Sequence, residues 1–500
     1  MSEHTNESGN DGGTRLFLLR LAAELTIKSR RTRGHFVRRL VHNLRDALRS
    51  AGIPHQVEPA WGRIFVRAPA AALPALARVF GISSLSPVAR TVPADLDAIV
   101  AAGSAEFRAE VAGRRFAVRA RRAGTHEFNS HDIEMRLGAA LLPHAARVDL
   151  TSPEVTAHVE VRDGEAYLFS RRVAGMGGLP LGVEGRAVAL ISGGYDSAVA
   201  AWMMLKRGIE LDYVFCNLGG DAYERAVVQV AKVLADEWSY GTSPRLFVVD
   251  FAEPVRALRE KVRSSYMQVV LKRLMYRAAS RIGSELKAHA IVTGEAVGQV
   301  SSQTLPNLRA IEAATELPMF RPLLGFDKEE IIERARRIGT AGLSEQVKEY
   351  CAIAPGKPVT AASVERVSEE ESRVDPGLLD VALAGRKVLD LRALSATDLV
   401  APYLFIEEIP DNAVVFDCRT EAQYRAWHLG GAEQRDELDL LRDFRRLDRD
   451  RTYVLYCAHG IQTAYLAERM QRAGFEAYSF RGGLRGVMEY ARRYGLAPRF

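Results

Sequence analysis

Apolar residues along the chain follow two spacings, and the change between them divides the sequence into regions. From about Val183 to Tyr350, short unbroken apolar runs alternate with longer segments that carry one apolar face. Such runs are typical of buried strands, and their alternation with helices predicts a doubly wound parallel sheet with helices on both faces. The strand candidates are Val188–Ile191, Tyr213–Cys216, Leu246–Val249 and Ala290–Thr293.

The N-terminal part has shorter and less regular periods, which predict two small α+β modules. In the first we expect strands at Leu16–Leu19 and Arg63–Arg67. The helix between them has apolar residues at near-helical spacing: Phe36, Leu40, Leu44 and Leu48. In the second, Phe116 and Val118 alternate with arginines, as in a strand with one basic, solvated face. Further strands are expected at Val155–Val161 and Glu165–Phe169.

The last hundred residues repeat the α/β pattern. Strands are expected at Val414–Asp417, Tyr453–Cys457 and Ala477–Phe480. The region from 355 to about 400 is charged and has no clear apolar period, so we expect a helical or flexible linker there.

Size and composition limit the alternatives. A chain of 500 residues is long enough for roughly three domains. No apolar run approaches the ~18 residues of a membrane span, and the polar N-terminus lacks a signal-peptide core. We therefore expect a cytoplasmic protein with no membrane partner. Four dispersed cysteines and a net charge of +6 exclude a disulfide framework and indicate a mildly basic surface.

One short loop carries the strongest chemical signal. It follows the strand that ends at Ile191 and precedes a helix, and it reads Ser192-Gly193-Gly194-Tyr195-Asp196-Ser197. Glycines let the backbone approach an anion, and the amides and dipole of a helix N-terminus favour negative charge. Asp196 fits beside phosphates if Mg²⁺ lies between them. The loop lacks the Gly-Lys-Ser/Thr of a Walker A motif and resembles the PP-loop of ATP pyrophosphatases. The alternative is a turn that only connects a strand to a helix.

A second signal lies near the C-terminus. Cys457 ends an apolar strand, and a helix begins a few residues later, which favours a thiolate or persulfide. From its position alone, Cys457 could equally be a buried structural cysteine. Upstream, Asp417-Cys418-Arg419 through Tyr424 and His428-Leu429-Gly430-Gly431-Ala432 resemble the rhodanese pattern, with Gln423 in place of its Glu. Rhodaneses carry sulfane sulfur at the position that Cys457 matches. Asp417, Arg419 and His428 are expected to be structural.

Across nearly its whole length the chain resembles the ThiI-type tRNA 4-thiouridine synthetases (tRNA sulfurtransferases). The most specific block is Thr293-Gly294-Glu295-Ala296-Val297-Gly298-Gln299-Val300-Ser301-Ser302-Gln303-Thr304. Other matches are Leu25–Ser29, Phe215–Gly220, Leu271–Arg273, Arg321–Leu323, Asp327–Glu329 and Glu349–Cys351.

The resemblance implies a multidomain α/β and α+β architecture. Its parts are a disordered tail (1–14), a ferredoxin-like domain (15–71), a THUMP domain (72–173), a PP-loop ATP pyrophosphatase domain (174–354), a linker (355–400) and a rhodanese domain (401–500).

The resemblance also implies the reaction and its residues. ATP with Mg²⁺ on Asp196 would adenylate O4 of the uridine at position eight of tRNA, and sulfur from a Cys457 persulfide would replace that oxygen. Cys351 would then form a disulfide with Cys457. Lys328 would be an active-site cation, although it could instead be only a solvated residue behind the Asp327–Glu330 capping box. The expected nucleotide contacts are Leu190, Ile191, Ser192, Gly193, Gly194, Asp196, Ser197, Phe215, Cys216, Lys272, Gly294 and Gln303. Cys418 is expected to be a core residue.

Two basic stretches are expected to contact tRNA phosphates, although runs of charge are usually solvated faces. They comprise Lys28, Arg30, Arg31 and Arg33, then Arg114, Arg115, Arg119, Arg121 and Arg122. A cysteine desulfurase would supply sulfur and a cytosolic thiol reductant would reset the cysteines. Sulfur delivery to a thiamin sulfur-carrier protein and a homodimer stay open. So do three other functions: a small-molecule PP-loop ligase, a sulfur relay that mainly serves thiamin synthesis, and a non-catalytic tRNA-binding scaffold.

Overall fold

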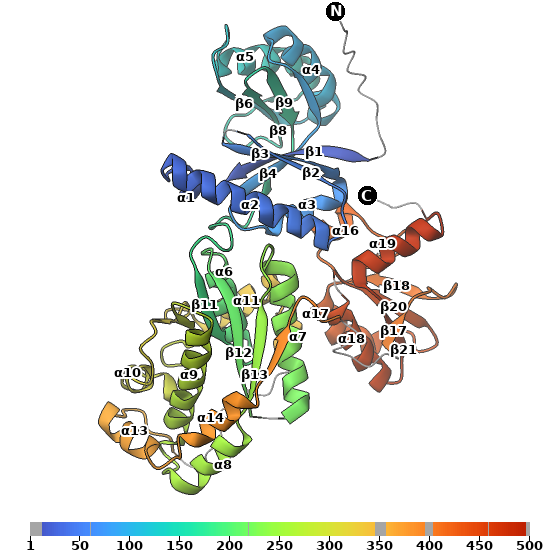
Figure 1. Cartoon of the computed structure of the whole chain (residues 1–500). Helices are drawn as coiled ribbons and strands as arrows, with labels where there is room; N and C mark the ends of the chain where they lie inside the picture. The colour runs from blue at the N-terminus through green and yellow to red at the C-terminus, as the bar shows by residue number, and fades with distance from the viewer. Residues whose placement is uncertain are drawn as a thin grey trace, which may run out of the picture. The chain divides into compact units, whose positions relative to one another are not determined.

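The structure, a computed structural model, describes residues 13–60, 62–218, 220–345, 357–395, 404–458 and 460–496. The chain folds as two compact units, residues 1–178 and 179–500. In these described ranges, four sheets organise the units, two in each (Figure 1). Among the described residues, no helix is both long and apolar enough to cross a membrane.

The first sheet of the N-terminal unit is antiparallel and has the strand order β10-β4-β1-β3-β2. Its strands are β1 (Thr14–Leu21), β2 (Gln56–Ala60), β3 (Arg63–Pro69), β4 (Ile82–Val88) and β10 (Val173–Ala174). The helices α1 (Ala23–Thr26), α2 (Arg30–Ser50) and α3 (Leu73–Arg78) accompany it. The expected apolar stripe of α2 is buried, which confirms the helical spacing predicted from the sequence.

The expected domain boundary between residues 71 and 72 is wrong. β4 pairs along most of its length with β1, and β10 returns after the second module to pair with β4. The first domain therefore extends to about residue 88 and also includes the short strand β10, which follows the second module in sequence. Strand partners far apart in sequence leave no local signal, so the period of apolar residues could not reveal this exchange.

The second sheet of the unit has the order β5-β9-β8-β6-β7 and one face covered by α4 and α5. The elements are β5 (Arg90–Pro93), α4 (Leu96–Val111), β6 (Arg115–Ala123), α5 (Ser130–Leu141), β7 (Arg147–Val148), β8 (Val155–Arg162) and β9 (Glu165–Phe169). Phe116 and Val118 are buried and Arg119 and Arg121 are exposed, as the pattern of β6 predicted, but Ala117 on the face expected to be solvated is buried as well.

A buried carboxylate joins the two sheets of this unit. Glu160 of β8, only 2% exposed, accepts hydrogen bonds from Arg20 of β1 at 3.0 Å and Arg63 of β3 at 2.7 Å. Arg162 adds a third bond at 2.8 Å. Burial raises the pKa of Glu160, but the arginines outweigh it and lower the net pKa, so the group stays charged. This ion cluster fixes the second module on the first sheet.

The third sheet begins the C-terminal unit and has the order β15-β14-β11-β12-β13-β16. Its strands are β11 (Arg186–Leu190), β12 (Glu210–Asn217), β13 (Arg245–Asp250), β14 (Ile291–Val292), β15 (Met319–Phe320) and β16 (Lys387–Asp390). All pairs are parallel except β13 with β16. The expected strands are present, and β11 lies at the centre, where the strand order changes direction.

Helices cover both faces of the third sheet (Figure 1). One face has α6 (Tyr195–Leu205), α7 (Gly220–Trp238), α11 (Lys328–Ile338) and α12 (Ala341–Ser344). The other has α8 (Ala252–Lys261), α9 (Met267–Glu285), α10 (Leu305–Glu312), α13 (Val364–Glu371) and α14 (Gly377–Ala384).

The linker expected at 355–400 is wrong for its described part, 357–395. Val367, Leu379 and Leu383 belong to the core around α9, and β16 closes the edge of the sheet. Glu371 of α13 pairs with Arg273 at 2.7 Å and with Arg277 at 2.6 Å. Of the charges that suggested a solvated linker, Glu371 is therefore a partner of basic residues on α9, and Glu370 is a buried partner of Arg263.

The fourth sheet is parallel, with the order β17-β21-β20-β18-β19. Its strands are β17 (Phe405–Ile406), β18 (Val414–Asp417), β19 (Glu433–Gln434), β20 (Thr452–Tyr456) and β21 (Glu476–Phe480). The helices are α16 (Glu421–Ala426), α17 (Glu437–Asp443), α18 (Ile461–Arg472) and α19 (Gly483–Arg493). The last hundred residues thus form an α/β sheet of their own within the C-terminal unit, as their pattern predicts.

We predict that Glu371→Ala destabilises the C-terminal unit by about 3 kcal/mol, because it leaves Arg273 buried without its carboxylate. The urea midpoint of that unit should fall. Glu369→Ala removes a half-exposed carboxylate (52%) from the same helix and serves as the control. If both variants unfold at the wild-type midpoint, residues 364–371 do not contribute to this core.

Candidate active site

Hydrogen bonds of two serines close the loop after β11, and α6 begins after a glycine of this loop. Gly193 has φ +76°, a conformation that glycine adopts without a steric penalty, and Gly194 is the N-cap of α6. Ser197 Oγ accepts from the Ser192 amide and donates to the Gly194 carbonyl, both at 3.2 Å. No side chain caps the helix, so its N-terminus can receive an anion.

Lys328 lies beside this helix N-terminus. Its Nζ donates to the two carboxylate oxygens of Asp196 at 2.9 and 3.1 Å. The capping box of Asp327 and Glu330 is also present at the start of α11. The capping box and the ion pair thus coexist, so Lys328 is not only a solvated residue of the first turn.

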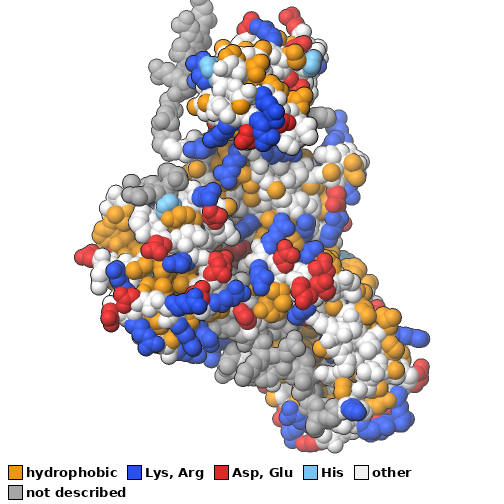
Figure 2. Space-filling view, turned by 180° about the vertical axis from the view of Figure 1, so that it is seen from behind, with side chains coloured by type: hydrophobic (Ala, Val, Ile, Leu, Met, Phe, Trp, Pro, Cys, Tyr) orange, Lys and Arg blue, Asp and Glu red, His pale blue; other side chains and the backbone are white. Residues whose placement is uncertain are grey.

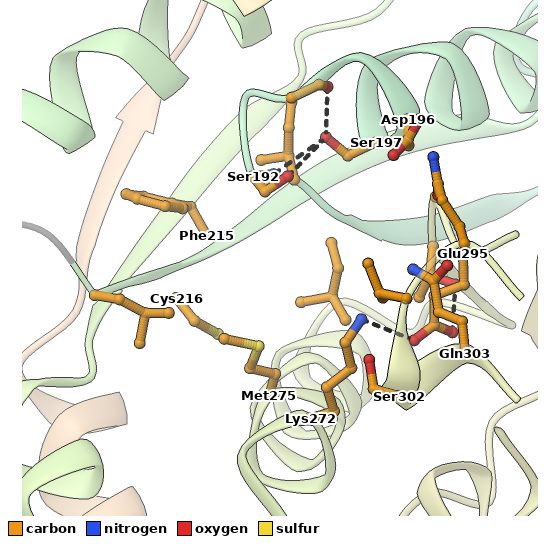
Figure 3. Close-up of a pocket in the computed structure, with 18 of the residues that line it drawn as sticks. Ser192, Asp196, Ser197, Phe215, Cys216, Lys272, Met275, Glu295, Ser302 and Gln303 are labelled. Carbon is orange, nitrogen blue, oxygen red and sulfur yellow. Dashed lines mark hydrogen bonds and ion pairs between the residues drawn. The ribbon is translucent and has the colours of Figure 1, made fainter. Parts of the chain in front are cut away.

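The loop forms part of the wall of a cavity of about 530 Å³ (Figure 3). Every residue expected to contact the nucleotide lines this cavity except Gly193, and Lys328 lines it too. In the close-up, Ser192 and Ser197 lie on one side, and Lys272, Ser302 and Gln303 lie on the other. Residues from five segments far apart in sequence therefore meet around one space, at the carboxyl ends of β11, β12 and β14.

Gly294 is where two of these segments touch. A Cβ built on it would lie 2.5 Å from the Asp196 carbonyl carbon and 2.5 Å from the Ser197 amide nitrogen. The chain leaving β14 is therefore in backbone contact with the first turn of α6. Only glycine allows this approach without moving the loop.

The wall opposite the loop contains a buried carboxylate to which the sequence pattern assigned no role. Glu295, 3% exposed, accepts from Lys272 Nζ at 3.0 Å, Arg321 Nε at 3.0 Å and Thr293 Oγ1 at 3.2 Å, and from the Tyr276 hydroxyl. Burial alone would raise the pKa of Glu295, but these partners lower it to about 2. Glu295 stood inside the block matched most specifically, but nothing local showed which residues would surround it.

A Mg²⁺ ion fits the donor set only together with phosphates. Among the described residues, no group of three or more His, Cys, Asp or Glu side chains is arranged to hold a metal. Asp196 is one carboxylate at the cavity wall, and Mg²⁺ is commonly held by one or two carboxylates plus phosphate oxygens and water. Its ion pair with Lys328 would have to rearrange.

Cys457 occupies a second potential reaction centre, in the fourth sheet's domain. Its Sγ accepts hydrogen bonds from the Gly460 amide at 3.2 Å and from Thr463 Oγ1 at 3.5 Å. Gly460, with φ +82°, is the N-cap of α18. The sulfur thus lies at a helix N-terminus, as the sequence predicted, although the residue is 2% exposed. These donors suit a sulfur anion.

The residues around this centre that were expected to be structural make internal contacts. Arg419 donates to Asp417 at 2.6 and 2.9 Å, in a buried pair. The His428 ring stacks on Tyr424 with a centroid distance of 3.9 Å. Gln423 completes a capping box with Thr420, so the replacement of Glu leaves this helix start intact.

The other cysteines divide into three situations. Cys418 is buried in the same core as Cys457, and burial, with a smaller contribution from Cys457, raises its pKa well above the usual value. Cys216 is buried and also lines the cavity beside the Ser192–Ser197 loop. Cys351 lies outside the described residues, as does His459.

Basic residues lie on the surface of the N-terminal unit, the upper part of Figure 2. Arg114 and Arg121 are exposed, whereas Arg115 pairs with Asp149 and Glu154. Arg119 bonds to the Leu150 carbonyl and Arg122 to the Gly124 carbonyl. In the other stretch, Arg30 and Arg31 are exposed in the first turn of α2, Lys28 lies over the Phe36 ring, and Arg33 contacts the Thr26 carbonyl.

A basic groove on the first domain was not expected from the sequence. It has a volume of about 700 Å³ and is lined by Arg38, His42, Arg45, Arg49 and His55, with an apolar floor from α2. The arginines recur at near-helical spacing on one face of α2, which a search for polar as well as apolar periods would have found.

Comparisons with known proteins agree with each part of this architecture. Family models match as "ThiI ferredoxin-like domain" (16–86), "THUMP domain" (93–171), "Thiamine biosynthesis protein (ThiI)" (182–375) and "Rhodanese-like domain" (402–489). The four expected domain types are thereby confirmed. The matched ranges also support the corrected boundary near residue 88 and the inclusion of α13 in the third domain.

Full-length relatives match as well. A tRNA sulfurtransferase of Desulfurococcus amylolyticus is 40% identical, over 94% of this chain and 97% of its own length. One of Pyrobaculum aerophilum is 39% identical, over 92% and 95%. A crystal structure of a 4-thiouridine synthetase–RNA complex with bound ATP has 32% identity and a TM-score of 0.66, over 75% of this chain and 99% of that one.

We predict that Gly294→Ala weakens ATP binding about tenfold or more, a loss of roughly 1.4 kcal/mol or more, because the added methyl group displaces the first turn of α6. Titration with ATP measures the effect. Gly325→Ala, where a Cβ meets no atom within 4 Å, should bind ATP like the wild type. Equal affinity in all three proteins would contradict the close approach.

Proposed function

The chain belongs to the tRNA sulfurtransferase family, and on this premise we propose that it is an enzyme that uses ATP to place sulfur in tRNA. The observation that carries this function is the presence of two centres in one polypeptide. One is a cavity with an open helix N-terminus and flanking lysines, and the other is a cysteine whose sulfur accepts a main-chain hydrogen bond. ATP activation needs the first, and sulfur transfer needs the second.

In the first half-reaction, O4 of the uridine at position eight attacks the α-phosphorus of ATP, and pyrophosphate leaves. The amides at the start of α6 would bind phosphate oxygens, and Lys272 and Lys328 would balance their charge. The fixed donors need little rearrangement as charge develops. Mg²⁺, held by Asp196 and the phosphates, would add Lewis-acid stabilisation of the leaving pyrophosphate.

In the second half-reaction, the terminal sulfur of a persulfide on Cys457 bonds to C4 of the activated base, and AMP leaves. The thiolate of Cys351 then attacks the Sγ of Cys457. The sulfur–sulfur bond of the carrier breaks, thiolated tRNA is released, and a Cys351–Cys457 disulfide remains. A cytosolic dithiol reductant must restore both thiols.

Partners and location stay predictions. A cysteine desulfurase would load Cys457, because the buried loop offers no arginine among its described residues to hold a small sulfur oxyanion. Delivery of sulfur to a thiamin sulfur-carrier protein would need only the last domain. A homodimer and a cytoplasmic location are further predictions.

We predict that Cys457→Ala forms no 4-thiouridine but still adenylates tRNA with release of pyrophosphate and still binds tRNA, because only the sulfur carrier is lost. The assay is mass spectrometry of nucleosides from tRNA incubated with protein, ATP, Mg²⁺, cysteine and a desulfurase. Cys418→Ala, which removes a buried thiol from the same core, is the control and should keep activity. Normal thiolation by Cys457→Ala would refute the sulfur-carrier role, and absence of thiolation by wild type would refute the proposed function.

We also predict that tRNA binding weakens steeply as salt increases. The double variant Arg114→Ala/Arg121→Ala should reduce the slope of log affinity against log salt by about 1 for each phosphate that is no longer neutralised. Arg485→Ala removes an exposed arginine (66%) from the last domain and is the control. An unchanged slope in the double variant would exclude this basic face from the RNA interface.

A further inference from the structure

Lys272 and Arg321 share one buried carboxylate, but their surroundings differ. Lys272 lines the nucleotide cavity, and its side chain is 19% exposed. Arg321 is 8% exposed and also donates to Glu312 at 2.7 Å. Of the two cations on Glu295, Lys272 is therefore the one placed to exchange its carboxylate for a ligand in the cavity.

The two carboxylate oxygens of Glu295 accept hydrogen bonds from different donors. Oε1 accepts from Lys272, and Oε2 accepts from Arg321, Thr293 and the Tyr276 hydroxyl. Burial raises the pKa of Tyr276 well above its usual value, so this hydroxyl keeps its proton and donates. The carboxylate would thus keep three donors if Lys272 turned toward a phosphate.

We infer that Glu295 is a positioning residue for nucleotide binding, which keeps the Lys272 ammonium protonated and aimed along the cavity wall and lets it turn to the nucleotide phosphates. This inference rests on the proposed ATP site. The redundancy of donors on Glu295 makes the turn possible, because the buried carboxylate does not lose all compensation when Lys272 leaves.

The charged groups that face Lys272 come from several elements. Glu295 follows β14, Tyr276 lies one turn along α9, and Arg321 follows β15. Across the cavity, Asp196 and Lys328 form their own ion pair. Of these groups, Glu295 is the carboxylate that accepts a hydrogen bond from the Lys272 ammonium, so it supplies opposite charge at this point.

The test is ATP binding between pH 6 and pH 9 by wild type and Glu295→Gln. In the variant, Lys272 lacks its counter-ion and loses its proton more readily as pH rises. ATP affinity should therefore be near wild type at pH 6 and about tenfold or more weaker at pH 9. Wild type should show no such fall. Glu312→Gln, which removes the half-exposed partner of Arg321, should follow wild type.

A second comparison covers the case in which Glu295→Gln folds poorly. Glu295→Gln/Lys272→Met removes both charges and leaves neither buried without a partner. Because Glu295 acts through Lys272, the double variant should bind ATP as weakly as Lys272→Met alone and with the same pH profile. A tenfold further loss in the double variant would overturn the inference.

A wild-type pH profile in Glu295→Gln would also overturn it, whatever the absolute affinity. A merely structural carboxylate would lower affinity equally at every pH. Since ATP binding is measured without tRNA, the outcome stays separate from the proposed function. If the profile shifts but wild type makes no 4-thiouridine, the role of Glu295 stands and the proposed function fails.

Discussion

The close approach of two backbone segments at Gly294 is the constraint on which the nucleotide cavity depends. The chain that leaves β14 lies against the first turn of α6, with no space for a Cβ between them. This contact fixes the serine-closed loop relative to the opposite wall, where Lys272 and Glu295 meet. A loop of glycines by itself would be mobile, and its amides would bind an anion only after they had been ordered.

The same physical device serves both reaction centres. At each, a glycine starts a helix without a side-chain cap, which leaves main-chain donors at the helix N-terminus, and at α18 the Cys457 sulfur accepts from one of them. In the third domain the site is open to a cavity, which suits a large charged ligand. In the last domain the site holds one sulfur atom, and the 2% exposure of Cys457 limits which molecules can reach it.

Buried carboxylates with several cationic partners join elements throughout the chain. Glu160 joins the first two sheets, Glu371 binds α13 to α9, and Glu295 connects the ends of β14 and β15 with α9. Such clusters cost desolvation energy, so their value lies in fixing one arrangement rather than in raw stability. At Glu295 one of the cations also faces the ligand cavity, which is why that cluster can have a part in function.

The sequence by itself determined the local features: the strand–loop–helix unit at residues 188–205, the cysteine at a helix start, the strand β6 and the capping box of Asp327 and Glu330. These follow from periods and turn chemistry within a few residues. The resemblance to a known family added the residues expected around the nucleotide. Local patterns could not reveal that β4 and β10 complete the first sheet, or that residues 364–390 complete the third, because strand pairing and ion pairing act between segments about a hundred residues apart. Local patterns likewise could not reveal the partners of Glu295. Its carboxylate acquired a role only when folding brought Lys272 and Tyr276 of α9 together with Arg321, which follows β15, at one buried point.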